Sequence, residues 1–289
     1  MANDLNELKF DYENKSMFSI AWELLKKSEK VAILFIIVAS LITYSIFFIT
    51  IISALLSSSR LIEYFEVIDY VNMLLYLGSP IFAIYGLLYH KGLGFFVKRF
   101  AEKNGLDYQD SDQLNSLSNS FSFSEGERSI KYVVSGLFKD HPTRFFVLYG
   151  GRKKFLVWET KFEKVDFPHI LLQSKKMSRL WKKDKNETKV SLSNKFSDKF
   201  DLYVTSGYEI EVLQIFTPEV LQILSDKNSE FSIEFVDRCM YVYDNNIVKN
   251  GKQLKEIFDV ARSVFDSAGL LINRLHDDFD VMHKYYAER

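Results

Sequence analysis

The sequence predicts an α+β protein in which two transmembrane helices precede a domain with a mainly antiparallel sheet and a long C-terminal helix. Two uncharged apolar runs, over residues 31–59 and 71–89, carry the first part of this prediction, because a helix needs about 20 apolar residues to cross a bilayer. Short β-rich segments separated by turn signals predict the sheet. Apolar residues at helical spacing over residues 254–275 predict the last helix.

Residues 1–30 are predicted to be a cytoplasmic segment that ends in a juxtamembrane helix, since apolar residues recur at helical spacing over residues 17–25. Lysines precede the first apolar run and basic residues follow the second, whereas the loop between them is mainly acidic. The positive-inside rule therefore predicts a transmembrane helical hairpin over residues 31–90 with both chain ends in the cytoplasm. The first run is too long for a signal peptide, so we expect a multi-pass protein of the inner (plasma) membrane.

A connecting helix is predicted over residues 91–106, where apolar side chains share one helix face and Asn104-Gly105 signals the end of the helix. The apolar face consists of Leu93, Phe96, Val97, Phe100 and Ala101.

Residues 107–289 are expected to form one cytoplasmic α+β domain. Hairpin turns are predicted at Gly150-Gly151 and at Asp237-Arg238, and Thr217-Pro218 predicts the start of a short helix. The β-rich segments span residues 131–138, 143–149, 155–162, 169–173, 200–205, 231–235 and 239–243.

Composition argues against several classes of protein. The formal net charge of −1 and the pI of about 6.5 argue against general nucleic-acid binding. Cys239 is the only cysteine, which excludes an intramolecular disulfide and fits a reducing compartment. Neither apolar run contains a charged residue, which argues against a transport pathway through the membrane.

The segment VSLSNKFSDKFDLYV at residues 190–204, together with Phe216-Thr217-Pro218 and the leucines that follow, resembles a bacterial family of uncharacterised membrane proteins. The resemblance extends from the first span to the closing helix. It implies two N-terminal spans, a cytoplasmic domain of unknown function and no assigned catalytic residues. From the residues alone, Phe196, Phe200, Leu202 and Val204 are expected in strands.

A basic segment with one aromatic side chain is the first candidate site. A domain tethered near an anionic leaflet could use it to contact lipid, because each basic side chain near such a surface can add about 1 kcal/mol of attraction. A solvated loop is the favoured alternative. The segment consists of Lys175, Lys176, Arg179, Trp181, Lys182, Lys183 and Lys185.

His276, Asp280 and His283 are the second candidate site, because their spacing places them on one helix face where they could bind a divalent metal. A solvated polar face is favoured, since no fourth ligand is suitably spaced. His141 and His169 stand beside prolines without a nucleophile or carboxylate at motif spacing, which favours turn residues over general bases.

No phosphate-binding loop, dinucleotide fingerprint, nucleophile elbow or zinc motif occurs, so no cofactor is predicted. The sequence favours a membrane-anchored cytoplasmic binding or scaffold protein rather than an enzyme. The lipid bilayer is its expected partner, with a membrane or cytoplasmic protein as a further candidate and no nucleic acid. The alternative is a metal-dependent enzyme or metal-binding domain that uses the His276, Asp280 and His283 face.

Overall fold

The computed structural model describes residues 92–112, 128–150, 153–180, 187–226, 231–245 and 251–287, with a few single residues before residue 54; side chains of the last helix are described as far as residue 269. Residues 1–14 and 97–289 form one compact unit, and residues 15–96 form another. Among the described residues, no helix combines the length and apolar character needed to cross a membrane. The predicted spans over residues 31–59 and 71–89 lie almost wholly outside the described residues.

The described part of the second half contains one nine-stranded sheet in the order β1-β2-β3-β4-β9-β8-β5-β7-β6. Every neighbouring pair is antiparallel. The strands are β1 (Asp107–Asp112), β2 (Arg128–Phe138), β3 (His141–Gly150), β4 (Lys153–Lys161), β5 (Phe167–Ser174), β6 (Glu187–Val190), β7 (Phe200–Thr205), β8 (Phe231–Asp237) and β9 (Cys239–Asp244). The predicted α+β class with a mainly antiparallel sheet and a long closing helix is thus confirmed.

Both predicted hairpins are present. Strands β3 and β4 pair antiparallel from Gly150 and Lys153 onward. Strands β8 and β9 are joined at Asp237, which has a positive φ of 51°, and Arg238. The β8–β9 hairpin lies between β4 and β5, so it joins the two halves of the sheet.

Helices lie before, between and after the strands. The connecting helix spans residues 92–104, and the predicted apolar residues on it are buried. The others are the 3₁₀ helix η3 (Lys175–Leu180), α4 (Asn194–Ser197), α5 (Glu209–Ile215), α6 (Pro218–Asp226) and α7 (Gly251–Ala287). Helix α6 starts as predicted, and the Val220 N–H donates to Thr217 Oγ1 at 3.4 Å. Phe196 was expected in a strand but lies in α4, because the turn at Ser193 closes helical backbone bonds there.

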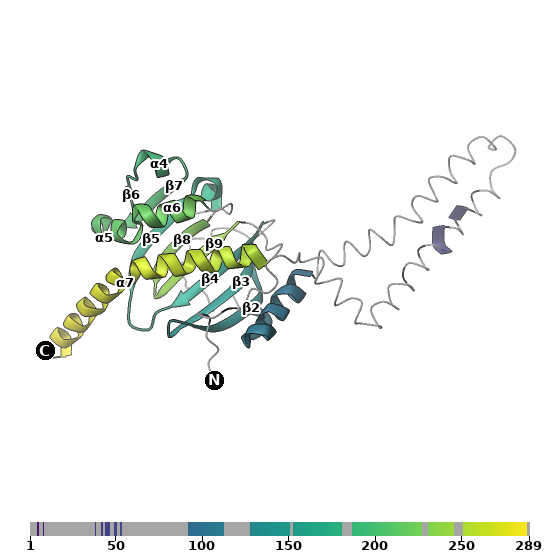
Figure 1. The fold of residues 1–289 in the computed structure, drawn as a ribbon, viewed down its shortest axis with the longest axis horizontal. Helices are drawn as coiled ribbons and strands as arrows, with labels where there is room; N and C mark the ends of the chain where they lie inside the picture. Colours follow the sequence, from purple (N-terminus) through teal and green to yellow (C-terminus); the bar gives the residue numbers. More distant parts are fainter. Residues whose placement is uncertain are drawn as a thin grey trace. The chain divides into compact units, whose positions relative to one another are not determined.

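Helix α7 lies across one face of the sheet (Figure 1), and aromatic side chains pack between the helix and the strands. Phe258 of α7 packs edge-on against Trp158 of β4, with ring centroids 4.5 Å apart, and against Phe145 of β3 at 5.4 Å. Phe265, about two turns further along the same face of α7, stacks on Phe162, with ring centroids 5.6 Å apart. Phe100 of the connecting helix also contacts Phe145 at 5.8 Å. These aromatic contacts hold α7 and the connecting helix against this face of the sheet.

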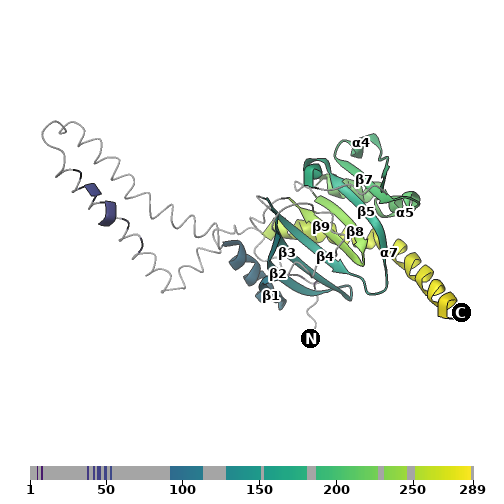
Figure 2. The same cartoon turned by 180° about the vertical axis from the view of Figure 1, so that it is seen from behind.

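The opposite face of the sheet has a different composition. Side chains alternate along a strand, so the residues that precede and follow these core aromatic residues point to the second face. Figure 2 shows the molecule from this side, with the strands in front of α7. A buried cluster there includes Phe146, Val157, Tyr241 and Met177 of η3. The same face carries the buried charged side chains Glu159 and Glu234, which define the sites below.

Candidate functional site

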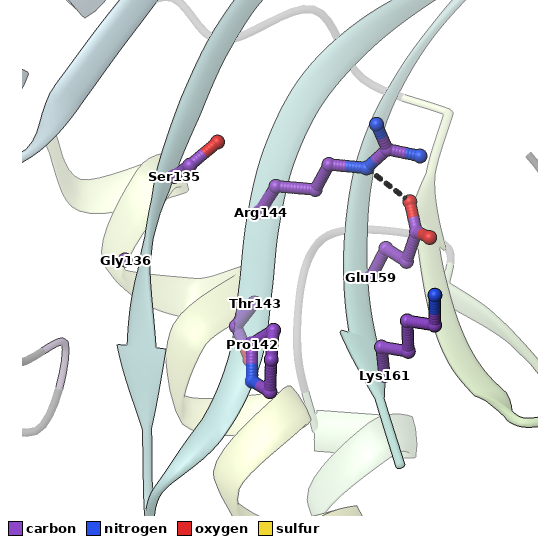
Figure 3. A pocket seen from close by; sticks show the side chains of 7 residues that line it. All are labelled: Ser135, Gly136, Pro142, Thr143, Arg144, Glu159 and Lys161. Atoms are coloured by element: carbon purple, nitrogen blue, oxygen red, sulfur yellow. Dashed lines mark hydrogen bonds and ion pairs between the residues drawn. The ribbon is translucent and has the colours of Figure 1, made fainter. Parts of the chain in front are cut away.

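A pocket of about 480 Å³ opens on this second face, over β2, β3 and β4 (Figure 3). Ser135 pairs with Arg144 across β2 and β3, and Arg144 pairs with Glu159 across β3 and β4. The strand register therefore places these three side chains in one row. The full lining is Ser135, Gly136, Pro142, Thr143, Arg144, Glu159 and Lys161.

Arg144 is held between two carboxylates. Its Nε donates to Glu159 Oε2 at 2.5 Å, and one terminal nitrogen donates to Asp112 Oδ2 of β1 at 2.7 Å. The Glu159 side chain is only 6% exposed. Burial raises the pKa of Glu159, while the nearby Arg144 charge acts in the opposite direction. The guanidinium is thereby fixed in position beside the pocket.

Cys239 lies next to this pair, with its Sγ 3.9 Å from Glu159 Oε1. Burial and then the charge of Glu159 raise the pKa of the Cys239 thiol to about 11. A thiol reacts as a nucleophile through its thiolate form. Cys239 is therefore protonated at neutral pH and is not an activated nucleophile.

The polar side chains of the lining fall into two groups. The first group already has partners within the protein. The Thr143 hydroxyl lies 3.1 Å from the Thr160 hydroxyl and 3.1 Å from the His141 carbonyl oxygen, and Arg144 donates to Glu159. The second group consists of the Ser135 hydroxyl and the Lys161 ammonium, which form no hydrogen bond or ion pair with the described part of the chain.

His169 of β5 is the centre of a second charged cluster on the same face. Its Nδ1 lies 2.5 Å from Glu187 Oε1, and its Nε2 lies 2.7 Å from Glu234 Oε1. The Tyr243 hydroxyl donates to the other Glu234 oxygen at 2.7 Å. Burial lowers the pKa of His169, but the two carboxylates outweigh it and raise its pKa to about 9. The ring is therefore a doubly protonated imidazolium at neutral pH.

The interpretation of His169 as a turn residue is wrong, because it lies in β5 and has two carboxylate partners. His141 likewise begins β3 rather than a turn. The partners of His169 are 18 and 65 residues away in the sequence. No local motif could reveal them, and the only sequence signal was a histidine within a β-rich segment.

The basic segment is described only in part. Lys175, Lys176 and Arg179 lie in η3, and the first two side chains are exposed. The Lys175 N–H donates to the Lys199 carbonyl at 3.0 Å, which attaches the start of η3 to the end of the α4 turn. Trp181, Lys182, Lys183 and Lys185 lie outside the described residues. Contact of this segment with lipid stays a prediction.

His276, Asp280 and His283 lie in α7, as predicted from their spacing. Their side chains lie beyond the described part of that helix. Where side chains are described, no group of three or more His, Cys, Asp or Glu residues could hold a metal ion. Metal binding at His276, Asp280 and His283 stays a prediction.

Comparison with known proteins gives little similarity. No protein-family model matches the chain, and no curated protein matches it. Among solved structures, the chain is similar to the mycobacterial trehalose monomycolate transport factor A, TtfA, with 14% sequence identity and a TM-score of 0.49. That alignment covers 62% of this chain and 96% of the other. We therefore infer function from the residues of the site.

Proposed function

We propose that this chain is a membrane-anchored binding protein. Two spans over residues 31–59 and 71–89 hold the α+β domain at the cytoplasmic face of the inner membrane, and the domain binds a ligand in the pocket over β2, β3 and β4. The pocket of about 480 Å³ carries this proposal. Its volume lies within the range of roughly 300 to 1,000 Å³ that is common for small-molecule sites.

The polar lining supports binding because it is organised before a ligand arrives. Glu159 and Asp112 fix Arg144 from two strands, so the guanidinium does not have to be ordered on binding. Such preorganisation removes part of the entropic cost of association. The protonated Cys239 thiol and the paired Glu159 carboxylate favour binding over covalent catalysis.

Membrane anchoring follows from the apolar runs and from the resemblance to two-span bacterial membrane proteins. The exposed Lys175 and Lys176 of η3 support contact with an anionic leaflet. A periplasm-active reporter fused to the C-terminus tests the topology. The reporter should be inactive, and activity outside the cytoplasm would reverse the proposed orientation.

Native mass spectrometry of the full-length protein extracted from membranes tests the binding function. We expect a bound molecule of defined mass, which is lost when Ser135→Phe fills the pocket. Ser191→Phe places the same side chain at an exposed position outside the pocket, and this control should keep the bound molecule. Identical spectra for the wild type and Ser135→Phe would contradict binding in this pocket.

A further inference from the structure

We infer that the ligand presents a phosphate or carboxylate group to this pocket, with Lys161 as the cation that binds it and Ser135 as a second donor. The inference rests on the proposed function, since it names the chemical class of the ligand for the same pocket.

Lys161 differs from Arg144 in how its charge is balanced. Arg144 contacts two carboxylates, of which Glu159 is buried and Asp112 is partly exposed. Lys161 lies two residues beyond Glu159 on β4, so it projects to the same face of the sheet. In Figure 3 the side chains of Lys161 and Arg144 extend on the same side of the strands as that of Ser135. Among the described residues the Lys161 ammonium forms no hydrogen bond to a carboxylate, although its charge acts on that of Glu159.

The hydrogen-bonding groups of Lys161 and Ser135 indicate which class of ligand fits the pocket. An ammonium only donates, and a serine hydroxyl readily donates to a strong acceptor. A ligand that accepts hydrogen bonds and brings negative charge to Lys161 suits this lining best, since charge-assisted hydrogen bonds are about twice as strong as neutral ones. Phosphate and carboxylate oxygens meet this requirement.

Glu159 does not prevent an anion from binding. Its side chain is 6% exposed, and its Oε2 accepts from Arg144. The Arg144 guanidinium at 2.5 Å already balances the charge of this carboxylate. The exposed Lys161 ammonium is thus the group that an incoming anion meets first.

Isothermal titration of the full-length protein in dodecyl maltoside tests the inference, at constant ionic strength and without phosphate in the buffer. Inorganic phosphate and glycerol 3-phosphate are the soluble probes, and phosphatidylglycerol added to the micelles is the lipid probe. Saturable binding of either kind is expected. Tighter binding of the lipid would identify a headgroup, and equal binding of glycerol 3-phosphate would identify a free phosphorylated molecule.

Lys161→Gln should weaken binding of the probe by about 10-fold, which corresponds to the loss of one charge-assisted hydrogen bond. Lys161→Arg should restore most of the affinity because it keeps the charge. Lys164→Gln removes an exposed lysine just beyond the strand and is the matched control, which should bind as the wild type does.

Wild-type affinity in Lys161→Gln, or no saturable binding of any anionic probe, would overturn the inference. If a neutral molecule is lost from Ser135→Phe in the mass spectra while anions fail to bind, the inference fails and the binding function stands. If Ser135→Phe changes nothing and no anion binds, both fail.

Discussion

The two charged clusters on the second face of the sheet have the same geometry but different cations. Arg144 lies on the third strand from the β1 edge, and it contacts the edge strand through Asp112 and the next inner strand through Glu159. His169 lies on the third strand from the β6 edge, and it contacts that edge strand through Glu187 and the inner strand β8 through Glu234. Each cation therefore attaches an edge strand to the sheet.

The two clusters differ in the solvent exposure of their carboxylates and in whether their cation loses its charge as the pH rises. The Glu187 and Glu234 side chains are 4% and 0% exposed, so both carboxylates of the His169 cluster are shielded from solvent, while the His169 side chain itself is 19% exposed. Asp112 is 26% exposed, and the Arg144 cluster borders the pocket. An arginine keeps its charge at every accessible pH, whereas a histidine does not. The comparison indicates that the His169 cluster serves the fold, whereas the Arg144 cluster also lines the pocket that we propose as a binding site.

Removing the histidine should have the largest effect. His169→Ala leaves Glu187 and Glu234 buried without their cation, so the free energy of unfolding should fall by about 3 to 5 kcal/mol at pH 7. Denaturant unfolding in detergent measures it. Lys189→Ala breaks the exposed Lys189–Asp201 pair on the same edge strand, and this control should cost less than about 1 kcal/mol. Equal losses for the two variants would show that the His169 cluster does not stabilise the edge strand.

The pH dependence of stability should distinguish the two cations. His169 has a folded-state pKa of about 9, above its ordinary value of 6.5. A raised pKa contributes stability that is complete below the ordinary value and is lost as the pH rises through the folded-state value. Unfolding free energy should thus fall by up to about 3 kcal/mol between roughly pH 6 and pH 10. Titration of the unfolding midpoint measures this loss, which should be absent in His169→Gln and present in Arg144→Lys.

Arg144→Lys should have an intermediate effect on stability. A lysine keeps the positive charge but cannot reproduce the planar fork that reaches both Glu159 and Asp112. We expect a loss of about 1 to 2 kcal/mol by denaturant unfolding. Arg238→Lys is the control, because the Arg238–Asp166 pair is half exposed on both sides. A loss in Arg144→Lys no greater than in Arg238→Lys would mean that the two-carboxylate geometry contributes nothing.

Asp112→Asn should have the smallest effect. The carboxylate is partly solvated, so losing its charge should cost about 0.5 to 1 kcal/mol. Hydrogen exchange of the β1 amides should become faster, while exchange in β6 stays unchanged. Faster exchange in both edge strands would indicate that the two clusters are coupled rather than independent.

The sequence predicted the elements whose signals are local. Two β-rich segments and the Gly150-Gly151 turn between them predicted the β3–β4 hairpin, and Thr217-Pro218 predicted the start of α6. It missed the edge strands β1 and β6, whose sequences DYQDSD and ETKV are mainly polar. These segments are strands because β2 and β7 supply their backbone partners, and side-chain composition alone could not show that.

By itself, the sequence determined the α+β class, the closing helix and the separation of apolar runs from a polar domain, because helix and strand periodicities depend on neighbouring residues. Only the tertiary structure decided the charged clusters. Arg144 meets Asp112 from 32 residues away, and His169 meets Glu234 from 65 residues away. Both contacts depend on the strand order: the first needs β1 and β3 on either side of β2, and the second needs the β8–β9 hairpin between β4 and β5. Strand order is set by the packing of the whole sheet against its helices, and no local spacing encodes it.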